Sequence, residues 1–238
     1  MTNTPNFAAK SDLPAPGSAL AILISGGIDS AILLAESVQL YAAVHPLYVR
    51  SGLQWEEAEQ AHLARFLTAL ACPALQPLKI LDMPTADLYG RHWSTSARDV
   101  PDDRSSDEAV YLAGRNVLLI AKALLWCHLQ AIPVLALAVL QANPFPDATP
   151  GFFAAIEQAL NLSVGGKVAI RRPYAHLTKA EVLKRGRWLR LEWTFSCLNP
   201  SGDRHCGECN KCAERRRGFV EADMEDPTPY VRRNSCTA

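Results

Sequence analysis

Five apolar segments alternate with segments of helical periodicity, and this alternation constrains the fold more than any other feature of the chain. The sequence predicts strands over residues 19–24, 44–49, 75–83, 133–140 and 167–174. The fourth segment is apolar throughout, as are strands that are covered on both faces of a parallel sheet. Strands that alternate with helices indicate an α/β fold with a doubly wound parallel sheet. Such sheets bind ligands beyond the carboxyl ends of their strands.

The sequence predicts helices over residues 28–41, 55–70, 116–130, 151–161 and 178–189. Residues 55–70 have the strongest periodicity, since Leu63, Phe66 and Leu70 recur on one side. Thr178 and Glu181 form a capping-box pattern at the start of the last helix. We expect a flexible leader over residues 1–18, a main domain over 19–192, and a metal-binding segment with a tail over 193–238.

Composition excludes several classes of protein. The 238 residues carry no formal net charge and the isoelectric point is near 7.0, which argues against a nucleic-acid partner. The longest apolar run, residues 131–140, is far shorter than the roughly 20 residues that span a bilayer. The first 18 residues contain no apolar signal core. We therefore expect a cytoplasmic protein with no membrane attachment.

A loop rich in glycine and serine follows the first predicted strand and reads Ser25-Gly26-Gly27-Ile28-Asp29-Ser30. Glycines let the backbone come close to a ligand, and the amides of such a turn bind anions at the start of a helix. The loop lacks the Walker A pattern G-x-x-x-x-G-K-[ST]. We expect it to hold a phosphate or pyrophosphate; the alternative is an ordinary turn capped by Asp29 or Ser30. Asp29 either caps the helix or binds Mg²⁺ that bridges phosphates.

Four cysteines lie within sixteen residues near the end of the chain, at Cys197, Cys206, Cys209 and Cys212. Four thiolates at such spacings complete a tetrahedral Zn²⁺ shell, while an iron–sulfur cluster and a set of buried free thiols are the alternatives. Four cysteine ligands leave no position for a catalytic water, so we expect a structural site. Cys72 and Cys127 are expected to be core thiols, and Cys236 has no identifiable partner.

The loop resembles the SGGxDS pyrophosphate loop of the N-type ATP pyrophosphatases, which adenylate a substrate and release pyrophosphate. The loop and the C-x8-C-x2-C-x2-C pattern together resemble the 7-cyano-7-deazaguanine synthase family. Four further segments are similar to that family: "GRN" (114–116), "PFPDATPGF" (144–152), "HLTKAEVLKRG" (176–186) and "FSC" (195–197). The resemblance spans residues 19–219.

The resemblance implies an ATP-dependent ligase that converts 7-carboxy-7-deazaguanine and ammonia to 7-cyano-7-deazaguanine through adenylated intermediates, in queuosine biosynthesis. It implies ATP, Mg²⁺ and Zn²⁺ as cofactors. Asp29 and Lys179 would then be catalytic, and Arg115, Asn116 and Asp147 would bind the substrate. The alternatives are a solvated surface role for Lys179, capping and a surface salt bridge for Arg115 and Asn116, and a turn cap for Asp147. Residues 84–107 suit a substrate lid or an oligomer contact, the latter consistent with a homodimer.

One segment departs from the family. The family reads "NAVDYSGYPDCRP" before and after its Pro-Asp pair, whereas this chain reads "LQANPFPDATP", with Ala148-Thr149 in place of Cys-Arg. The departure favours, as an alternative, a paralogue that adenylates a different carboxylate or acts on a protein conjugate. A tRNA sulfur transferase would need a basic face and a free catalytic cysteine pair. The last alternative is a non-catalytic nucleotide-binding or zinc-scaffold protein.

The remaining charged residues have simpler interpretations. Arg215, Arg216 and Arg217 are expected on a solvated or acid-paired face, with an anion site as the alternative. Glu56, Glu57 and Glu59 are interpreted as favourable charges in the first turn of a helix. His62 and His128 are expected to be structural, and His205 to neighbour the metal site.

Overall fold

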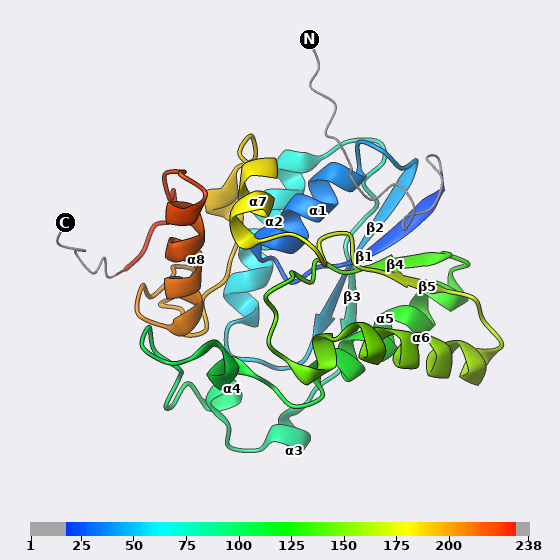
Figure 1. The fold of residues 1–238 in the computed structure, drawn as a ribbon, viewed down its shortest axis with the longest axis horizontal. Coiled ribbons are helices and arrows are strands. Elements are labelled where there is room, and N and C mark those ends of the chain that lie inside the picture. Colours follow the sequence, from blue (N-terminus) through cyan, green and yellow to red (C-terminus); the bar gives the residue numbers. More distant parts are fainter. Residues whose placement is uncertain (1–17, 232–238) are drawn as a thin grey trace, which may run out of the picture.

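The computed structural model describes residues 18–231 and contains a five-stranded, all-parallel sheet (Figure 1). The strand order is β3-β2-β1-β4-β5. The strands are β1 (Ala19–Leu23), β2 (Ala43–Arg50), β3 (Lys79–Asp82), β4 (Val134–Ala136) and β5 (Ala169–Arg171). The chain moves outward from β1 in one direction and later returns to its other side, so the predicted doubly wound α/β fold is confirmed. Residues 1–17 of the expected leader, and Cys236, lie outside the described residues.

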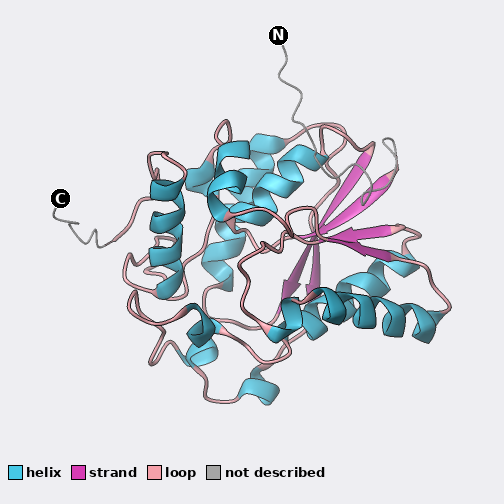
Figure 2. Ribbon diagram, viewed as in Figure 1, coloured by secondary structure: helices cyan, strands magenta, loops and turns pink. Residues whose placement is uncertain are grey.

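Helices cover both faces of the sheet (Figure 2). On one face, Leu20 and Ile22 of β1 pack in a core with α1 (Ile28–Ser37), α2 (Glu56–Leu70) and α7 (Lys179–Arg185). On the other face, Ala21 and Leu47 pack with α5 (Arg115–Leu129) and α6 (Pro150–Val164). Because side chains alternate along a strand, β1 contributes to both cores. None of the helices in residues 18–231 combines the length and the apolar character needed to cross a membrane.

Three strands are shorter than their apolar segments predict. The fourth segment, 133–140, is a strand only over β4, although the Leu137 amide still donates to the Arg171 carbonyl, and residues 137–139 line a cavity beyond the strand end. The third segment, 75–83, pairs regularly only over β3, although Leu75 forms one isolated bridge with Val44. The fifth is shortened in the same way. Apolar character marks burial, and residues that wall a cavity are buried without being paired.

Several short elements and one long helix have no counterpart in the sequence prediction. The structure adds α3 (Ala86–Tyr89), α4 (Trp93–Ser96) and α8 (Asn210–Glu221), with 3-10 turns at Asp107–Val110, Pro146–Ala148 and Leu191–Trp193. Half of the α8 residues are charged, so the helix lacks the apolar periodicity by which helices are found. The predicted capping box of α7 is confirmed, since the Thr178 hydroxyl accepts from the Glu181 amide and the Glu181 carboxylate accepts from the Thr178 amide.

A buried carboxylate fixes α7 against α1. Glu36 of α1 is 2% exposed and accepts hydrogen bonds from the Tyr174 hydroxyl at 2.6 Å and from Arg185 Nε at 2.7 Å. Burial, with the Glu36 charge, raises the pKa of Tyr174, so the phenol remains a donor. A buried carboxylate with two donors is stable where an unpaired one would not be. This contact places the start of α7, and with it Lys179, at the carboxyl edge of the sheet.

We predict that Gly186→Ala destabilises the fold. A Cβ atom at Gly186 would lie 2.4 Å from Cδ1 and Cγ1 of Ile32, so α7 and α1 would have to move apart. Overpacking of this kind costs about 1–3 kcal/mol. The free energy of unfolding, measured by urea denaturation, should fall by that amount. Gly151→Ala is the control, since a Cβ there meets nothing within 4 Å; equal stabilities of the two variants would contradict the packing.

Candidate functional site

The glycine loop connects β1 to α1 with a backbone that only glycine accommodates easily. Gly26 has φ of +74°, and a Cβ atom there would lie 3.2 Å from Cγ of Glu59. The Ser30 hydroxyl donates to the carbonyl of Gly27 at 3.2 Å, and the Ser25 amide donates to the Ser30 hydroxyl. The N-cap residue Gly27 has no side-chain cap. The alternative interpretation of Asp29 or Ser30 as a helix cap is therefore wrong.

Asp29 and Lys179 form an ion pair beside the loop. Lys179 Nζ lies 2.7 Å and 3.0 Å from the two carboxylate oxygens of Asp29, and 3.6 Å from Glu214 Oε1. Burial lowers the pKa of Lys179, but the two carboxylates outweigh it and hold the pKa above its ordinary value. The lysine therefore stays charged. The alternative of a solvated Lys179 is wrong, since its side chain is 17% exposed.

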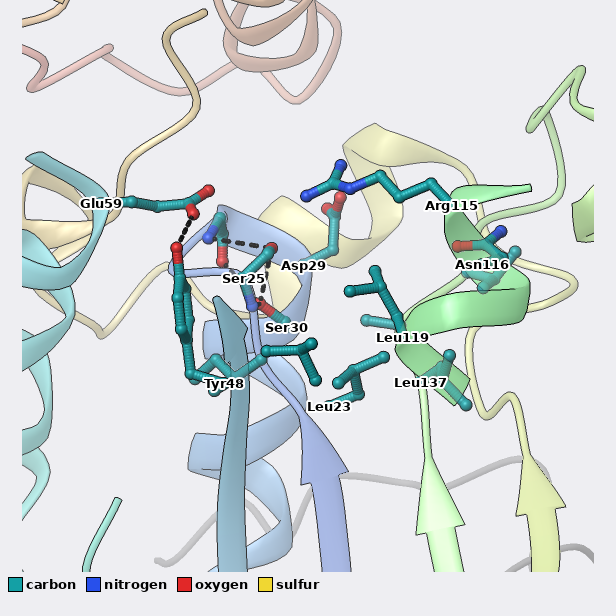
Figure 3. A pocket seen from close by; sticks show the side chains of 15 residues that line it. Leu23, Ser25, Asp29, Ser30, Tyr48, Glu59, Arg115, Asn116, Leu119 and Leu137 are labelled. Carbon is teal, nitrogen blue, oxygen red and sulfur yellow. Dashed lines mark hydrogen bonds between the residues drawn. The ribbon is translucent and has the colours of Figure 1, made fainter. Parts of the chain in front are cut away.

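Three cavities meet at this edge of the sheet. The strand cavity, about 200 Å³, is walled by Leu23, Tyr48 and Leu137 at the ends of β1, β2 and β4 (Figure 3). The loop cavity, about 190 Å³, borders the glycine loop, and the aromatic cavity, about 230 Å³, borders Trp55 and Trp93. Both adjoin the strand cavity. Arg115 lines all three. In Figure 3 its side chain extends from α5 toward Asp29. A charged guanidinium at the junction suits a reaction between groups that are bound in separate cavities.

The structure brings Arg115, Asn116 and Asp147 together. The Asn116 amide donates to Asp147 Oδ2 at 3.1 Å, and Asn116 Nδ2 donates to the Asp147 carbonyl at 2.9 Å. Asp147 is 7% exposed, and its Oδ1 has no hydrogen-bond partner among residues 18–231. Arg115 Nε is likewise buried without a partner in that part of the chain. Buried polar atoms without partners at a cavity wall indicate groups that a ligand satisfies.

Aromatic side chains line the cavity that Asp147 adjoins. Trp55 and Trp93 stack with centroids 5.8 Å apart, and Tyr111 lies 5.1 Å from Phe145 across the same cavity. Flat aromatic walls with a few polar groups are suited to a planar heterocycle. Two positions at which the chain departs from the family's pattern do not line this cavity. Ala148 packs in the core with α5 and α6, and the Thr149 hydroxyl accepts from Phe152 at the start of α6.

Glu59 is a site residue that the sequence interpretation missed. It is 7% exposed, it lines the strand and loop cavities, and it accepts a hydrogen bond from the Tyr48 hydroxyl at 2.6 Å. Burial raises its pKa to about 8. Glu56, Glu57 and Glu59 do lie in the first turn of α2, as predicted, but this interpretation is incomplete because Glu56 also accepts from the amides of Ser51 and Gly52. The spacing of Glu59 with Leu63 and Phe66 on the buried side of α2 was the available signal.

The four predicted cysteines lie together. Their sulfur atoms are all within 4.8 Å of one another, with Cys206 and Cys212 3.9 Å apart and Cys197 and Cys209 4.0 Å apart. Metal–sulfur bonds of about 2.3 Å in a tetrahedron place sulfurs roughly 3.8 Å apart, so the donor set fits a four-coordinate metal. Backbone amides also donate to the sulfurs, for example Leu198 to Cys209 at 3.4 Å, which stabilises thiolates.

The cysteine segment is joined directly to the glycine loop. The Phe195 amide donates to the Gly26 carbonyl at 2.8 Å, and Ser196 and Leu198 line the loop cavity. Cys209 is the N-cap of α8, and Cys212 lies in its first turn. His205 is buried, and its Nε2 accepts from the Ser196 amide at 3.1 Å. The segment that carries the four cysteines therefore forms one wall of the site.

The three consecutive arginines of α8 have different environments. Arg217 is exposed and lies 3.4 Å from Asp107, which confirms the acid-paired interpretation for this residue. Arg216 donates to the carbonyl of Gly207. Arg215 is 1% exposed and lines the loop cavity, so a solvated or acid-paired face is wrong for it. Neighbouring residues of a helix are rotated by about 100°, which sends the three side chains to different sides of α8. The sequence analysis predicted no helix over these residues and therefore could not derive this separation.

Comparisons with known proteins show the family of this chain. A family model described as queuosine biosynthesis protein QueC matches residues 19–223. The chain belongs to this family. The 7-cyano-7-deazaguanine synthase of Syntrophobacter fumaroxidans is 32% identical over 231 residues, covering 89% of this chain and 95% of the relative. That of Thiobacillus denitrificans is 32% identical over 222 residues, covering 89% and 97%. A solved 4-thiouridine synthetase–RNA complex with bound ATP is similar at 15% identity and a TM-score of 0.47, covering 87% of this chain and 50% of that chain, which is too distant to bear on activity.

We predict that removing the metal from the cysteine cluster destabilises the protein. Four thiols that lose their metal leave the 197–212 segment without its central cross-link. Treatment with a strong chelator, or Cys206→Ser, should lower the thermal midpoint by roughly 5–10 °C. Metal content by mass spectrometry is measured in parallel. Cys72→Ser, outside the cluster, is the control, and an unchanged midpoint after complete metal loss would contradict the role.

We predict a pH-dependent stability that arises from Glu59. Its pKa rises from 4.5 to about 8 on folding, so the folded state binds more protons than the unfolded state between these values. The carboxyl therefore costs stability as pH rises through this window. Glu59→Gln removes the titration. The free energy of unfolding of this variant minus that of the wild type should therefore rise by about 1–4 kcal/mol between pH 5 and pH 8.5. Glu57→Gln, at an exposed position of the same helical turn, is the control, and an equal change in both variants would contradict the assignment to Glu59.

Proposed function

We propose that this protein is an ATP-dependent carbon–nitrogen ligase that converts 7-carboxy-7-deazaguanine and ammonia to 7-cyano-7-deazaguanine in queuosine biosynthesis. The glycine loop at the end of β1, closed by the cysteine segment through the Phe195–Gly26 hydrogen bond, is the observation that carries the proposal. Membership of the QueC family supports it, because the curated relatives are named 7-cyano-7-deazaguanine synthases.

The loop is proposed to hold the phosphates of ATP. The backbone amides of residues 25–30 and the N-terminus of α1 attract anions, and the hydroxyls of Ser25 and Ser30 add donors. Lys179 neutralises the departing pyrophosphate. A Mg²⁺ ion, when bound, would supply further charge neutralisation, and Asp29 is the carboxylate in the loop cavity that would hold it. The cysteine cluster is proposed to hold Zn²⁺ in a closed, structural site.

The substrate base is proposed to occupy the aromatic cavity. The planar ring would lie among the aromatic side chains, and the unpartnered Oδ1 of Asp147 would accept from an N–H of the base. Asn116 holds Asp147 in place through two hydrogen bonds. Arg115, at the junction of the cavities, would face the substrate carboxylate and the α-phosphate together. This arrangement places the two reactants in contact while their remaining parts are held apart.

The reaction then follows from two adenylations. The carboxylate oxygen attacks the α-phosphorus of ATP and pyrophosphate leaves; ammonia displaces AMP and loses a proton, which gives the amide. The amide oxygen attacks a second ATP, again releasing pyrophosphate, and loss of AMP with a proton leaves the nitrile. None of these steps needs a cysteine nucleophile, which agrees with four of the cysteines being gathered in one cluster.

A second candidate is a paralogue that adenylates another carboxylate or a protein conjugate. The observation in its favour is that Asn143 and Phe145, from the segment that departs from the family's pattern, line the aromatic cavity. A tRNA sulfur transferase is the weaker alternative, since the cysteines of residues 18–231 outside the cluster are Cys72 and the fully buried Cys127. The absence of a nucleic-acid partner, the homodimer and the cytoplasmic location stay predictions.

We predict that the purified protein forms the nitrile from ATP, Mg²⁺, ammonium and 7-carboxy-7-deazaguanine, detected by mass spectrometry. Asp29→Asn should reduce pyrophosphate release at least about a hundredfold, because it removes the carboxylate that is proposed to hold Mg²⁺ and that pairs with Lys179. Asp147→Asn should mainly raise KM for the deazapurine, by roughly tenfold or more, because the base loses a charged acceptor. ATP turnover with other carboxylates but no nitrile would contradict the substrate and favour the paralogue. Full activity of Asp29→Asn would contradict the loop assignment.

A further inference from the structure

Arg215 is a buried cation that lacks an acidic partner. It is 1% exposed, and none of the ion pairs formed among residues 18–231 includes it. Its hydrogen bonds go to uncharged oxygens: Nε donates to Thr228 Oγ1 at 2.6 Å, Nη1 to Thr194 Oγ1 at 2.9 Å and Ser196 Oγ at 3.2 Å, and Nη2 to the Leu191 carbonyl at 2.8 Å. The fold thus encloses a positive charge that these contacts orient but do not neutralise.

A buried charge with no counter-charge in direct contact is costly, and Asp226, Cys212 and Asp29 act on Arg215 only from beyond ion-pair distance. Transferring an ion out of water costs several kcal/mol even after the protein relaxes, and hydrogen bonds to neutral groups recover only part of this. Burial accordingly lowers the pKa of Arg215, although a guanidinium stays protonated at neutral pH. If Arg215 only linked α8 to the neighbouring segments by hydrogen bonds, a side chain without a full charge would be sufficient. The cost is offset where an anion binds next to the side chain.

Arg215 faces a cavity suited to an anion. It lines the loop cavity together with Ser25, Gly27, Asp29 and Lys179. A guanidinium has five N–H donors, and the four hydrogen bonds given above leave one N–H on Nη2. The wall of the cavity therefore includes a fixed charge with one N–H that forms no hydrogen bond within residues 18–231.

The other cations of the loop cavity are already engaged, with one exception. Lys179 pairs with Asp29 at 2.7 Å and with Glu214 at 3.6 Å, and Lys211 pairs with Glu214 at 2.5 Å. In the described part of the chain, the cations of this cavity that form no ion pair are Arg115 and Arg215. Arg115 lies at the junction of the three cavities, so Arg215 is the unpaired cation on the side of α8.

We propose that Arg215 is an anion receptor of the loop cavity, which binds a phosphate oxygen of the nucleotide and of the departing pyrophosphate. The proposal rests on the proposed function in so far as ATP is the ligand of the glycine loop. Arg215 lies three residues after Cys212 on α8, and Cys209 caps that helix. The metal cluster therefore fixes the helix that carries the receptor, which gives a closed four-cysteine site a part in nucleotide binding.

The test measures the binding of inorganic pyrophosphate with Mg²⁺ to the full-length, metal-loaded protein by isothermal titration calorimetry. Arg215→Met should weaken binding by roughly tenfold or more, because a charge-assisted hydrogen bond and its charge are lost. Arg215→Lys keeps the charge but not the fork, and should give an intermediate loss. Arg217→Met removes an exposed arginine two residues further along the same helix, and should change affinity by less than about twofold.

A variant of Thr228 separates binding from a merely structural role. Thr228→Val removes the Nε partner but keeps the guanidinium charge, so it should lower the thermal midpoint while affinity stays near that of the wild type. If Arg215→Met does not fold, the pair Arg215→Lys and Arg217→Lys decides the question. Wild-type affinity in the folded Arg215 variants would overturn the proposal. A wild-type protein that binds neither pyrophosphate nor ATP would instead contradict the proposed function, so the two failures are distinguishable.

Discussion

The hydrogen bond from the Phe195 amide to the Gly26 carbonyl is the contact on which the site depends. It joins a loop near the start of the chain to the segment that carries the cysteine cluster. The left-handed backbone of Gly26 turns its carbonyl toward that segment, and no other residue type adopts this conformation as readily. The loop cavity lies between these two pieces of chain, so neither the phosphate loop nor the cysteine segment forms it alone.

The electrostatics of the site differ from those of the whole chain. The full sequence carries 24 basic and 24 acidic residues. Around the loop cavity, four cations (Arg115, Lys179, Lys211 and Arg215) face two carboxylates, those of Asp29 and Glu214, while burial keeps the third, Glu59, largely protonated at neutral pH. A neutral protein can thus present a locally positive, partly buried cavity, where charge acts more strongly than on the surface. The net charge of a chain indicates whether it binds nonspecific charged partners, but it gives no information on the local charge of such a site.

Much of the fold was predictable because its signals are local. Apolar runs identified all five strands, the capping box identified the start of α7, and the spacing of Cys197, Cys206, Cys209 and Cys212 identified the cluster. Glu59 was not found, and an anion site at Arg215 was only the less favoured alternative, since both roles arise from burial and from contacts such as those with Tyr48 and Thr228. The predicted length of β4 was wrong for a related reason, because residues in cavity walls and residues in strands are equally apolar. Long-range contacts decide what such residues do, and a single sequence does not encode them in any short pattern.

The separation of Gly26 from Phe195 along the chain has a consequence for biosynthesis. Chains emerge from the ribosome from the N-terminus at about 5–20 residues per second, so the glycine loop is made many seconds before the segment that closes it. The parallel pairing of β1 with β4 also waits for residues just past the middle of the chain. Contacts between such distant positions slow folding. Nucleotide binding is therefore expected to begin only when the last quarter of the polypeptide has been synthesised, which would keep nascent chains catalytically silent.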